Sequence, residues 1–248
     1  MNDIANQPVV PDPGEGWQKR NLRPRDAATL ILVERRAGVP HILMGRRSRQ
    51  HVFYPGAYVF PGGRVDRTDG AVPTADETPE ATRQRLMRAM KGRPSERRAR
   101  ALMLAAVRET FEETGILLGV TGEIEEAPRT ADWQAFFSHD VVPALSPLAF
   151  IARAITPPRR SRRFDTRFFA ADANAIAKML PPEDRPTDEL SELVWLPIDE
   201  ARSLKIPNIT RAVLAELEQR LDEPGELTAD LPVPFFHAVR GSFVRDLL

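Results

Sequence analysis

Three glutamates stand close together in the segment RETFEETGI, which spans residues 108–116. Glu112 and Glu113 follow Glu109 by three and four positions, so at about 100° per residue all three carboxylates project from one face of a helix. Their like charges repel one another, and Arg108 is the one basic residue beside them. Because hard divalent ions such as Mg²⁺ prefer oxygen ligands, this face indicates a cation site, with an ordinary acidic helix end as the alternative.

A rigid turn lies upstream of the glutamates. Residues 60–63 read Phe-Pro-Gly-Gly, and glycine allows the backbone to approach a ligand or a metal closely. Taken alone, the sequence of this turn predicts no more than a turn.

Composition excludes several classes of function. The 248 residues include 35 basic and 35 acidic ones, so no global positive charge attracts nucleic acid or a membrane. Cysteine is absent, which excludes disulfides, thiolate metal sites and a cysteine nucleophile, and agrees with a reducing, cytoplasmic location. No signal peptide and no run of about 18 apolar residues is found, so we expect no membrane partner. Thirty-one of the basic residues are arginine, whose planar fork suits phosphate.

The elements that must position these residues predict one mixed α/β domain. Strands are expected over 27–36, 41–47, 116–120, 149–155, 163–170 and 193–196. Helices are expected over 80–91, 95–114, 199–204 and 210–221, with a helical turn over 133–138. We divide the chain into an extended N-terminal arm (1–24), the domain (25–222) and a C-terminal tail packed on it (223–248).

The glycine turn and the glutamates together resemble the signature of the Nudix hydrolase family, G-x5-E-x7-R-E-U-x-E-E-x-G-U, where U is aliphatic. Gly63 matches the opening glycine, and the second half is matched in register by Arg108, Glu109, Glu112, Glu113, Gly115 and Ile116. Asp69 stands where the signature has its first glutamate, and Thr110 stands at an aliphatic position. The chain also has about 31 more residues than the pattern between Asp69 and Arg108.

These additional residues predict a helical insertion over about 70–98, either a lid over the substrate cleft or a surface excursion. A similar insertion marks a branch that includes peroxisomal coenzyme A diphosphatases. Arg47, Ser48, Gly56 and residues 60–63 also resemble the pattern R-S-x3-R-x3-G-x3-F-P-G-G of coenzyme A-cleaving members, although its second arginine is Val52 here.

The resemblance implies an α/β/α sandwich with a mixed sheet. It also implies metal-dependent hydrolysis of the pyrophosphate bond in a nucleoside diphosphate linked to another moiety, such as coenzyme A or acyl-coenzyme A. Mg²⁺ or Mn²⁺ would be held by Glu109, Glu112, Glu113 and the carbonyl of Gly63, and Arg108 would orient a glutamate.

Other roles stay open at this stage. Arg47, Arg64 and Arg163 are candidates for binding substrate phosphates. Asp188, Glu189 and Glu192 are candidates for the general base, and Asp69 is a candidate for an additional ligand. The alternative function is a Nudix-fold module that binds a nucleotide derivative or regulates without cleaving it. We expect no nucleic-acid partner, and the choice between monomer and homodimer is open.

Overall fold

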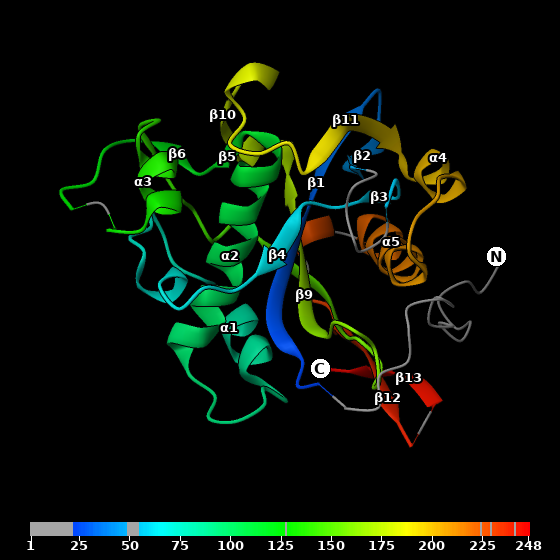
Figure 1. The fold of residues 1–248 in the computed structure, drawn as a ribbon. Helices are drawn as coiled ribbons and strands as arrows, with labels where there is room; N and C mark the ends of the chain where they lie inside the picture. The colour runs from blue at the N-terminus through cyan, green and yellow to red at the C-terminus, as the bar shows by residue number, and fades with distance from the viewer. Residues whose placement is uncertain (1–21, 49–54, 127, 224, 229, 241) are drawn as a thin grey trace.

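A large mixed sheet forms the centre of the protein (Figure 1). The computed structural model describes residues 22–48, 55–126, 128–223, 225–228, 230–240 and 242–248. The strand order is β11-β2-β1-β9-β8-β12-β13, with β3 paired to β2 and β4 paired to β1. Strand β1 is parallel to β9, and β12 is parallel to β8, whereas the other pairs are antiparallel. The strands of this sheet are β1 (Arg25–Arg36), β2 (Val39–Arg47), β3 (Tyr58–Val59), β4 (Gly62–Arg64), β8 (Ala149–Ile155), β9 (Phe164–Asp172), β11 (Leu190–Pro197), β12 (Pro234–Val239) and β13 (Ser242–Leu247).

Helices cover both faces of the sheet, so the expected α/β/α sandwich with a mixed sheet is confirmed. One apolar core contains side chains of α1 (Glu80–Met87), α2 (Glu96–Thr114) and α3 (Ala131–Phe137). A second core, on the other face, contains side chains of α4 (Ile198–Ser203) and α5 (Asn208–Leu221). Among the described residues, none of the helices has both the length and the apolar composition that crossing a bilayer requires.

Smaller elements complete the fold. Two short pairs lie outside the large sheet: β5 (Ile116–Leu118) with β10 (Ile176–Met179), and β6 (Val120–Thr121) with β7 (Val141–Val142). Within the described part of the chain, four 3-10 helices lie in connecting segments: η2 (Asp69–Ala71), η3 (Ala173–Ala175), η4 (Pro182–Asp184) and η5 (Glu226–Thr228).

Helix α2 carries the glutamates in its last turns, and its bounds agree with the expected helix over 95–114. It begins after Ser95, whose side chain caps the helix by accepting from the backbone N–H of Arg98. It ends at Gly115, which has the left-handed conformation (φ 73°) that favours glycine. Thr110 is buried at the aliphatic position, and its hydroxyl group is satisfied by the carbonyl of Ala106 at 2.7 Å.

Two expected elements differ from the structure. The helix expected over 80–91 ends at Met87 because Arg88 is extended and Ala89 has a positive φ of 55°. The strand expected over 116–120 is interrupted at Gly119, whose φ is 149°. The other predicted strands and helices of the domain are present with ends shifted by a few residues, and the turn at 133–138 is part of α3.

Helix α1 lies in the segment for which an insertion was predicted, but it does not lie over the glutamates. Its buried Leu86 belongs to the same core as α2. Figure 1 shows α1 beside the N-terminal part of α2, whereas Glu112 and Glu113 occupy the C-terminal turns. The apolar side of α1 covers the end of α2 that lies away from the carboxylate cluster, and a lid over the substrate cleft stays a prediction.

The structure describes most of the predicted C-terminal tail but little of the predicted N-terminal arm. Residues 223–248 contribute β12 and β13 to the large sheet, where β12 adds to the edge strand β8. The tail is thus continuous with the hydrogen-bonded core of the domain. Most of the expected N-terminal arm, residues 1–21, lies outside the described residues.

Candidate active site

The guanidinium group of Arg108 lies at the centre of the carboxylate cluster. Its Nη1 donates to Glu109 and Glu112, each at 3.0 Å. Its Nη2 donates to the backbone carbonyl of Arg64 at 2.8 Å, and its Nε donates to Oδ1 of Asp69 at 3.1 Å. Arg108 is only 3% exposed, so these four partners replace the water that its charge would otherwise require. The orienting role implied for Arg108 agrees with these contacts.

Asp69 is the buried counter-charge of Arg108. Its carboxylate is completely inaccessible to solvent, and it also accepts from the indole Nε1 of Trp133 at 3.0 Å and the backbone N–H of Asp66 at 2.8 Å. Helix α3 brings Trp133 into place, since the neighbouring Phe136 packs edge-on against Phe111 of α2. Asp69 therefore supports the site from behind, and its oxygens are used by these donors.

The glycine turn forms the wall opposite α2. The backbone N–H of Gly62 donates to Oε2 of Glu113 at 2.9 Å. A Cβ atom at Gly63 would lie 2.4 Å from the carboxyl atoms of Glu109, which is closer than real Cβ contacts allow. Because β4 pairs with β1, the sheet itself holds this turn against the glutamates. A side chain at position 63 would therefore displace the carboxylate of Glu109 from its present position.

Burial and mutual repulsion make the glutamates unusually easy to protonate. Burial raises the pKa of Glu109 to about 7, and the charges of Glu112 and Glu189 raise it as well. The nearby charge of Arg108 acts against them by lowering this pKa. Burial, followed by the charge of Glu189, raises the pKa of Glu113 well above its ordinary value. Burial also raises the pKa of Glu112. Burial lowers the pKa of Arg108, but its hydrogen bond to Asp69 and the charges of the surrounding carboxylates raise it. The net result is a pKa above the ordinary value for arginine.

These carboxylates fit a hard divalent cation by chemistry. Burial, with nearby acidic charges acting in the same direction, raises the pKa of Glu109, Glu112 and Glu113. Arg108 is the buried arginine among them, so the carboxylates outnumber the positive charge and suit a cation. Among the described residues no three acidic or histidine side chains are arranged to hold an ion. In this arrangement Arg108 and the N–H of Gly62 donate to the carboxylate oxygens of the cluster. The side chains of Glu109, Glu112 and Glu113, with the carbonyl of Gly63, would hold the cation after exchanging those partners.

Of the three late acidic candidates, Glu189 is the one that reaches the cluster. It lies in the segment before β11 and raises the pKa of both Glu109 and Glu113. Its Oε1 is 3.5 Å from Nη1 of Arg47. The hydroxyl group of Thr187 donates to the backbone carbonyl of Glu112 at 3.1 Å, which fixes this segment to the end of α2.

Glu192 and Asp188 have different surroundings. Glu192 is exposed and accepts from the phenol of Tyr58 at 3.0 Å, and its carboxylate is 3.6 Å from the guanidinium of Arg46. Asp188 is exposed. The partners of Glu192 lie outside the carboxylate cluster.

The three arginines predicted to bind substrate lie in different surroundings. Arg47 lies beside the cluster, where its charge lowers the pKa of Glu113. Arg64 contributes its carbonyl to Arg108, and its exposed side chain lines a neighbouring cavity. The guanidinium of Arg163 donates to the carbonyls of Thr156 and Leu22, at 3.0 and 2.6 Å, and so fixes the start of the described chain. Val52 lies outside the described residues.

The role of Trp133 was missed by the sequence reasoning, which assigned it only to a helical turn. It lies 64 positions from Asp69, and no motif joins them. A large aromatic residue with a polar N–H is usually buried only when that N–H finds an acceptor. This preference is the one sequence signal that points to a partner, and it does not identify the partner.

Comparisons with known proteins agree with this fold. No model of a protein family matches the chain. A Caenorhabditis elegans protein named as nudix hydrolase 7 is 28% identical over 184 residues, which cover 69% of this chain and 51% of that protein. The chain thus spans about half the length of this curated relative.

Solved structures give a second comparison. The crystal structure of a NUDIX hydrolase from Alicyclobacillus acidocaldarius has a TM-score of 0.56 and 26% identity, and the match covers 78% of this chain and 90% of that one. The NUDIX domain of Shewanella oneidensis NrtR, solved with ADP ribose, has a TM-score of 0.45 and 14% identity over 81% of this chain and 90% of that one. The fold is the Nudix fold, and the chain is similar in sequence to the nematode and Alicyclobacillus proteins.

The buried pair of Arg108 and Asp69 leads to a stability prediction. In Asp69→Asn the guanidinium keeps its burial and loses its counter-charge, so we expect the free energy of unfolding to fall by about 3–5 kcal/mol. Asp66→Asn is the matched control, because Asp66 is exposed and contacts Asp69 through its backbone. It should change stability by less than about 0.5 kcal/mol. Equal urea denaturation midpoints for the two variants would contradict this account.

Proposed function

We propose that this chain, which has the Nudix fold and resembles Nudix hydrolases, hydrolyses the pyrophosphate bond of a nucleoside diphosphate linked to another moiety. The observation that carries the proposal is the cluster of Glu109, Glu112 and Glu113 around one buried arginine, closed by the Gly62-Gly63 turn. Such concentrated negative charge is costly in the absence of a cation. Its use in hydrolysis explains why the cost is tolerated.

The reaction joins a water oxygen to one phosphorus atom and breaks the bond from that phosphorus to the bridging oxygen. Nudix hydrolases use divalent metal ions, and an ion such as Mg²⁺ or Mn²⁺, when bound, neutralises phosphate charge and lowers the pKa of water. Arg108 holds Glu109 and Glu112 in position. The carboxylate of Glu189 accepts the proton of the attacking water, since it is the late carboxylate within electrostatic reach of the cluster.

The argument for a diphosphate substrate comes from an arginine beside the carboxylate cluster. Arg47 beside Glu189 is suited to one oxygen of the diphosphate, because its guanidinium lies at the edge of the carboxylate cluster. Coenzyme A and acyl-coenzyme A are the specific candidates. Release of phosphorylated products from coenzyme A, acyl-coenzyme A, ADP-ribose, dinucleotides and NADH would distinguish them. A homodimer and a cytoplasmic location stay predictions.

A Nudix-fold module that binds a nucleotide derivative without cleaving it is the alternative function. Such a module needs complementarity to its ligand but has no need of buried, mutually repelling carboxylates. The raised pKa values of Glu109 and Glu113 therefore favour the enzyme. Binding without product release from any substrate of that panel would favour the module instead.

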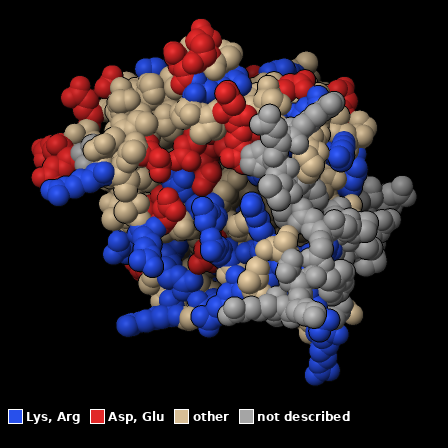
Figure 2. Space-filling model, viewed as in Figure 1, with Lys and Arg blue, Asp and Glu red and all other residues tan. Residues whose placement is uncertain are grey.

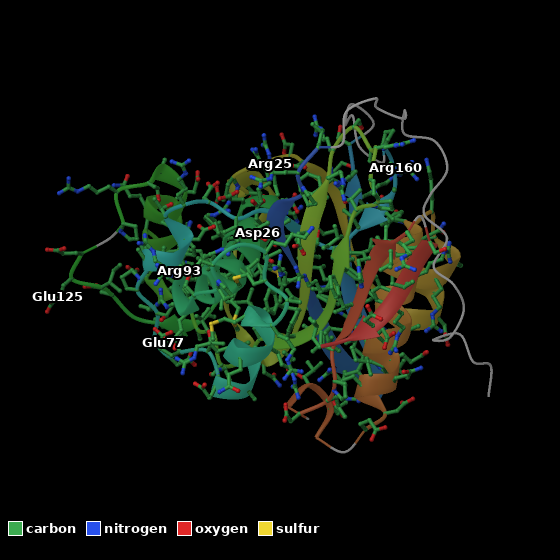
Figure 3. All side chains as sticks on the ribbon, turned by 90° about the horizontal axis from the view of Figure 1, so that it is seen from below. Arg25, Asp26, Glu77, Arg93, Glu125 and Arg160 are labelled. Carbon is green, nitrogen blue, oxygen red and sulfur yellow. The ribbon has the colours of Figure 1, made fainter. Side chains whose placement is uncertain are left out.

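The first functional prediction concerns Glu112. Glu112→Gln keeps the shape of the side chain and removes one negative charge, so the protein should stay folded while turnover falls by at least about 100-fold. Glu125→Gln is the control, because Glu125 is exposed and projects from the edge of the molecule (Figure 3). Steady-state product release measures the change. Full activity of Glu112→Gln would exclude the proposed ligand role.

Glu189 and Glu192 provide a matched pair for the general base. Glu189→Gln should lower kcat by at least about 100-fold, with little change in KM, because it removes the proton acceptor. Glu192→Gln should retain the wild-type kcat, since its partners are Tyr58 and Arg46. If the two variants lost the same activity, the assignment of Glu189 would fail.

Divalent ions should stabilise the folded protein. At ten times its Kd an ion that binds only the native state contributes about 1.4 kcal/mol. For a chain of this size we expect Tm to rise by about 3–6 °C. The rise should be seen with Mg²⁺ or Mn²⁺ in the wild type and be much smaller in Glu109→Gln. Differential scanning calorimetry in the presence of chelator gives the baseline, and an identical rise in both proteins would place the ion elsewhere.

A further inference from the structure

A strongly basic cavity lies beside the carboxylate cluster. It has a volume of about 670 Å³ and is bounded by the start of β1, by β4 with the residues after it, and by the N-terminal half of α2. Four exposed arginines line it: Arg25, Arg64, Arg67 and Arg97. We name this cavity the arginine groove. On the face that Figure 2 shows, a group of acidic side chains lies next to a broad group of basic ones.

A second cavity adjoins the arginine groove. This cavity has a volume of about 650 Å³ and shares Arg25 and Arg64 with the groove. Its far side includes Arg23 and Arg162. The two cavities together present several separated positive charges to a ligand. Figure 3 labels Arg25 and Asp26, which both line the groove, near each other.

The positive charge of the groove is not balanced by the protein. No carboxylate of the described residues forms an ion pair with its four arginines, although Asp26 and Asp66 also line the cavity. Asp26 is already used: one oxygen is 3.0 Å from Arg98 and the other is 2.9 Å from Arg167. Elsewhere many arginines have acidic partners. Because the whole chain is electrically neutral, this groove is a local excess of positive charge.

The start of α2 increases that charge further. Arg97 lies in the first turn of the helix, where the aligned peptide dipoles already give a partial positive charge. A cation is unfavourable at this end, and a bound anion is favourable. By this argument the position of Arg97 is unfavourable in the free protein and becomes favourable beside a bound anion.

Arg64 connects the groove to the reaction centre. It follows Gly62 and Gly63 in β4, and its backbone carbonyl accepts from Arg108 at 2.8 Å. Its side chain lies in the groove, while its backbone belongs to the carboxylate cluster. A single elongated ligand that reaches the glutamates therefore meets the arginines with its next charged group.

We propose that the arginine groove binds phosphate groups of the substrate other than the two that are separated by hydrolysis. This inference rests on the proposed function. Guanidinium groups bind phosphate through paired, charge-assisted hydrogen bonds, and four of them suit a ligand with several negative charges. The additional phosphate is either a monoester on the nucleoside or a further unit of a longer phosphate chain, and both have the same chemistry in the groove.

Binding of inorganic tripolyphosphate tests the groove without catalysis. Isothermal titration in the presence of chelator compares the wild type with Arg67→Gln/Arg97→Gln. We expect the double variant to bind at least tenfold more weakly, and we expect affinity to fall as salt is raised. Arg88→Gln is the matched control, since Arg88 is also exposed and lies outside the groove. Equal affinity in the double variant and the wild type would overturn the proposal.

Two substrate pairs distinguish the sources of the additional phosphate. Coenzyme A is compared with 3′-dephospho-coenzyme A, and diadenosine tetraphosphate with diadenosine diphosphate. In the pair that matches the natural source, we expect the wild type to favour the more phosphorylated member at least tenfold in kcat/KM. Arg67→Gln/Arg97→Gln should lose that preference through KM, and Arg88→Gln should retain it. No preference in either pair, despite hydrolysis, would overturn the proposal.

Failure of the groove and failure of the enzyme are distinguishable. If no substrate is hydrolysed but tripolyphosphate binding still depends on Arg67 and Arg97, the hydrolase proposal fails and the phosphate site stands. If hydrolysis proceeds and the arginines affect neither affinity nor preference, the proposal for the arginine groove fails and the hydrolase proposal stands. Arginine-dependent binding of a single-stranded RNA, with no binding of tripolyphosphate, would assign the surface to nucleic acid and overturn the proposal.

Discussion

The site depends on the buried charge of Arg108. A guanidinium group that is 3% exposed is tolerated only when each of its donors has an acceptor and its charge is balanced. Asp69 supplies the charge from behind, and Glu109 and Glu112 supply it from the front. One side chain therefore connects the core to the reactive surface and fixes the position of both glutamates.

This requirement organises elements that are distant in sequence. The carbonyl of Arg64 brings β4 against α2, and β4 is in turn held by its pairing with β1. Asp69 needs a further donor, and Trp133 of α3 provides it. The sheet, the 3-10 turn at Asp69 and helix α3 are thus connected through one charged group. A polar network of this kind is stable only when all of its members are satisfied.

The distribution of arginine separates structural from functional charge. Arg108, Arg153 and Arg167 are buried and paired with aspartates, so they belong to the framework of the domain. The exposed arginines of the groove have no acidic partner among the described residues, and their charge is available to an external ligand. Acidic and basic surfaces then lie side by side, one suited to cations and the other to phosphate.

Local sequence determined the parts of the site that depend on chain neighbours. The spacing of Glu109, Glu112 and Glu113 follows from helical geometry, and Ser95 and Gly115 delimit their helix by capping chemistry that acts within a few residues. The resemblance to a family signature added the fold and the glycine turn. For this reason the helix, the mixed sheet and the members of the cluster could be predicted before the structure was known.

Tertiary structure decided what depends on residues far apart in the chain. Asp69 became the buried counter-charge of Arg108 because Trp133 and Arg108 meet it from other elements. Sequence could not distinguish Glu189 from Glu192 as the carboxylate beside the cluster. That distinction depends on how their segment packs against α2 and β2. Helix α1 packs against the far end of α2 because its apolar Leu86 is needed in that core. Sequence spacing carries no record of these contacts, since burial and charge pairing are set by which surfaces meet in the folded protein.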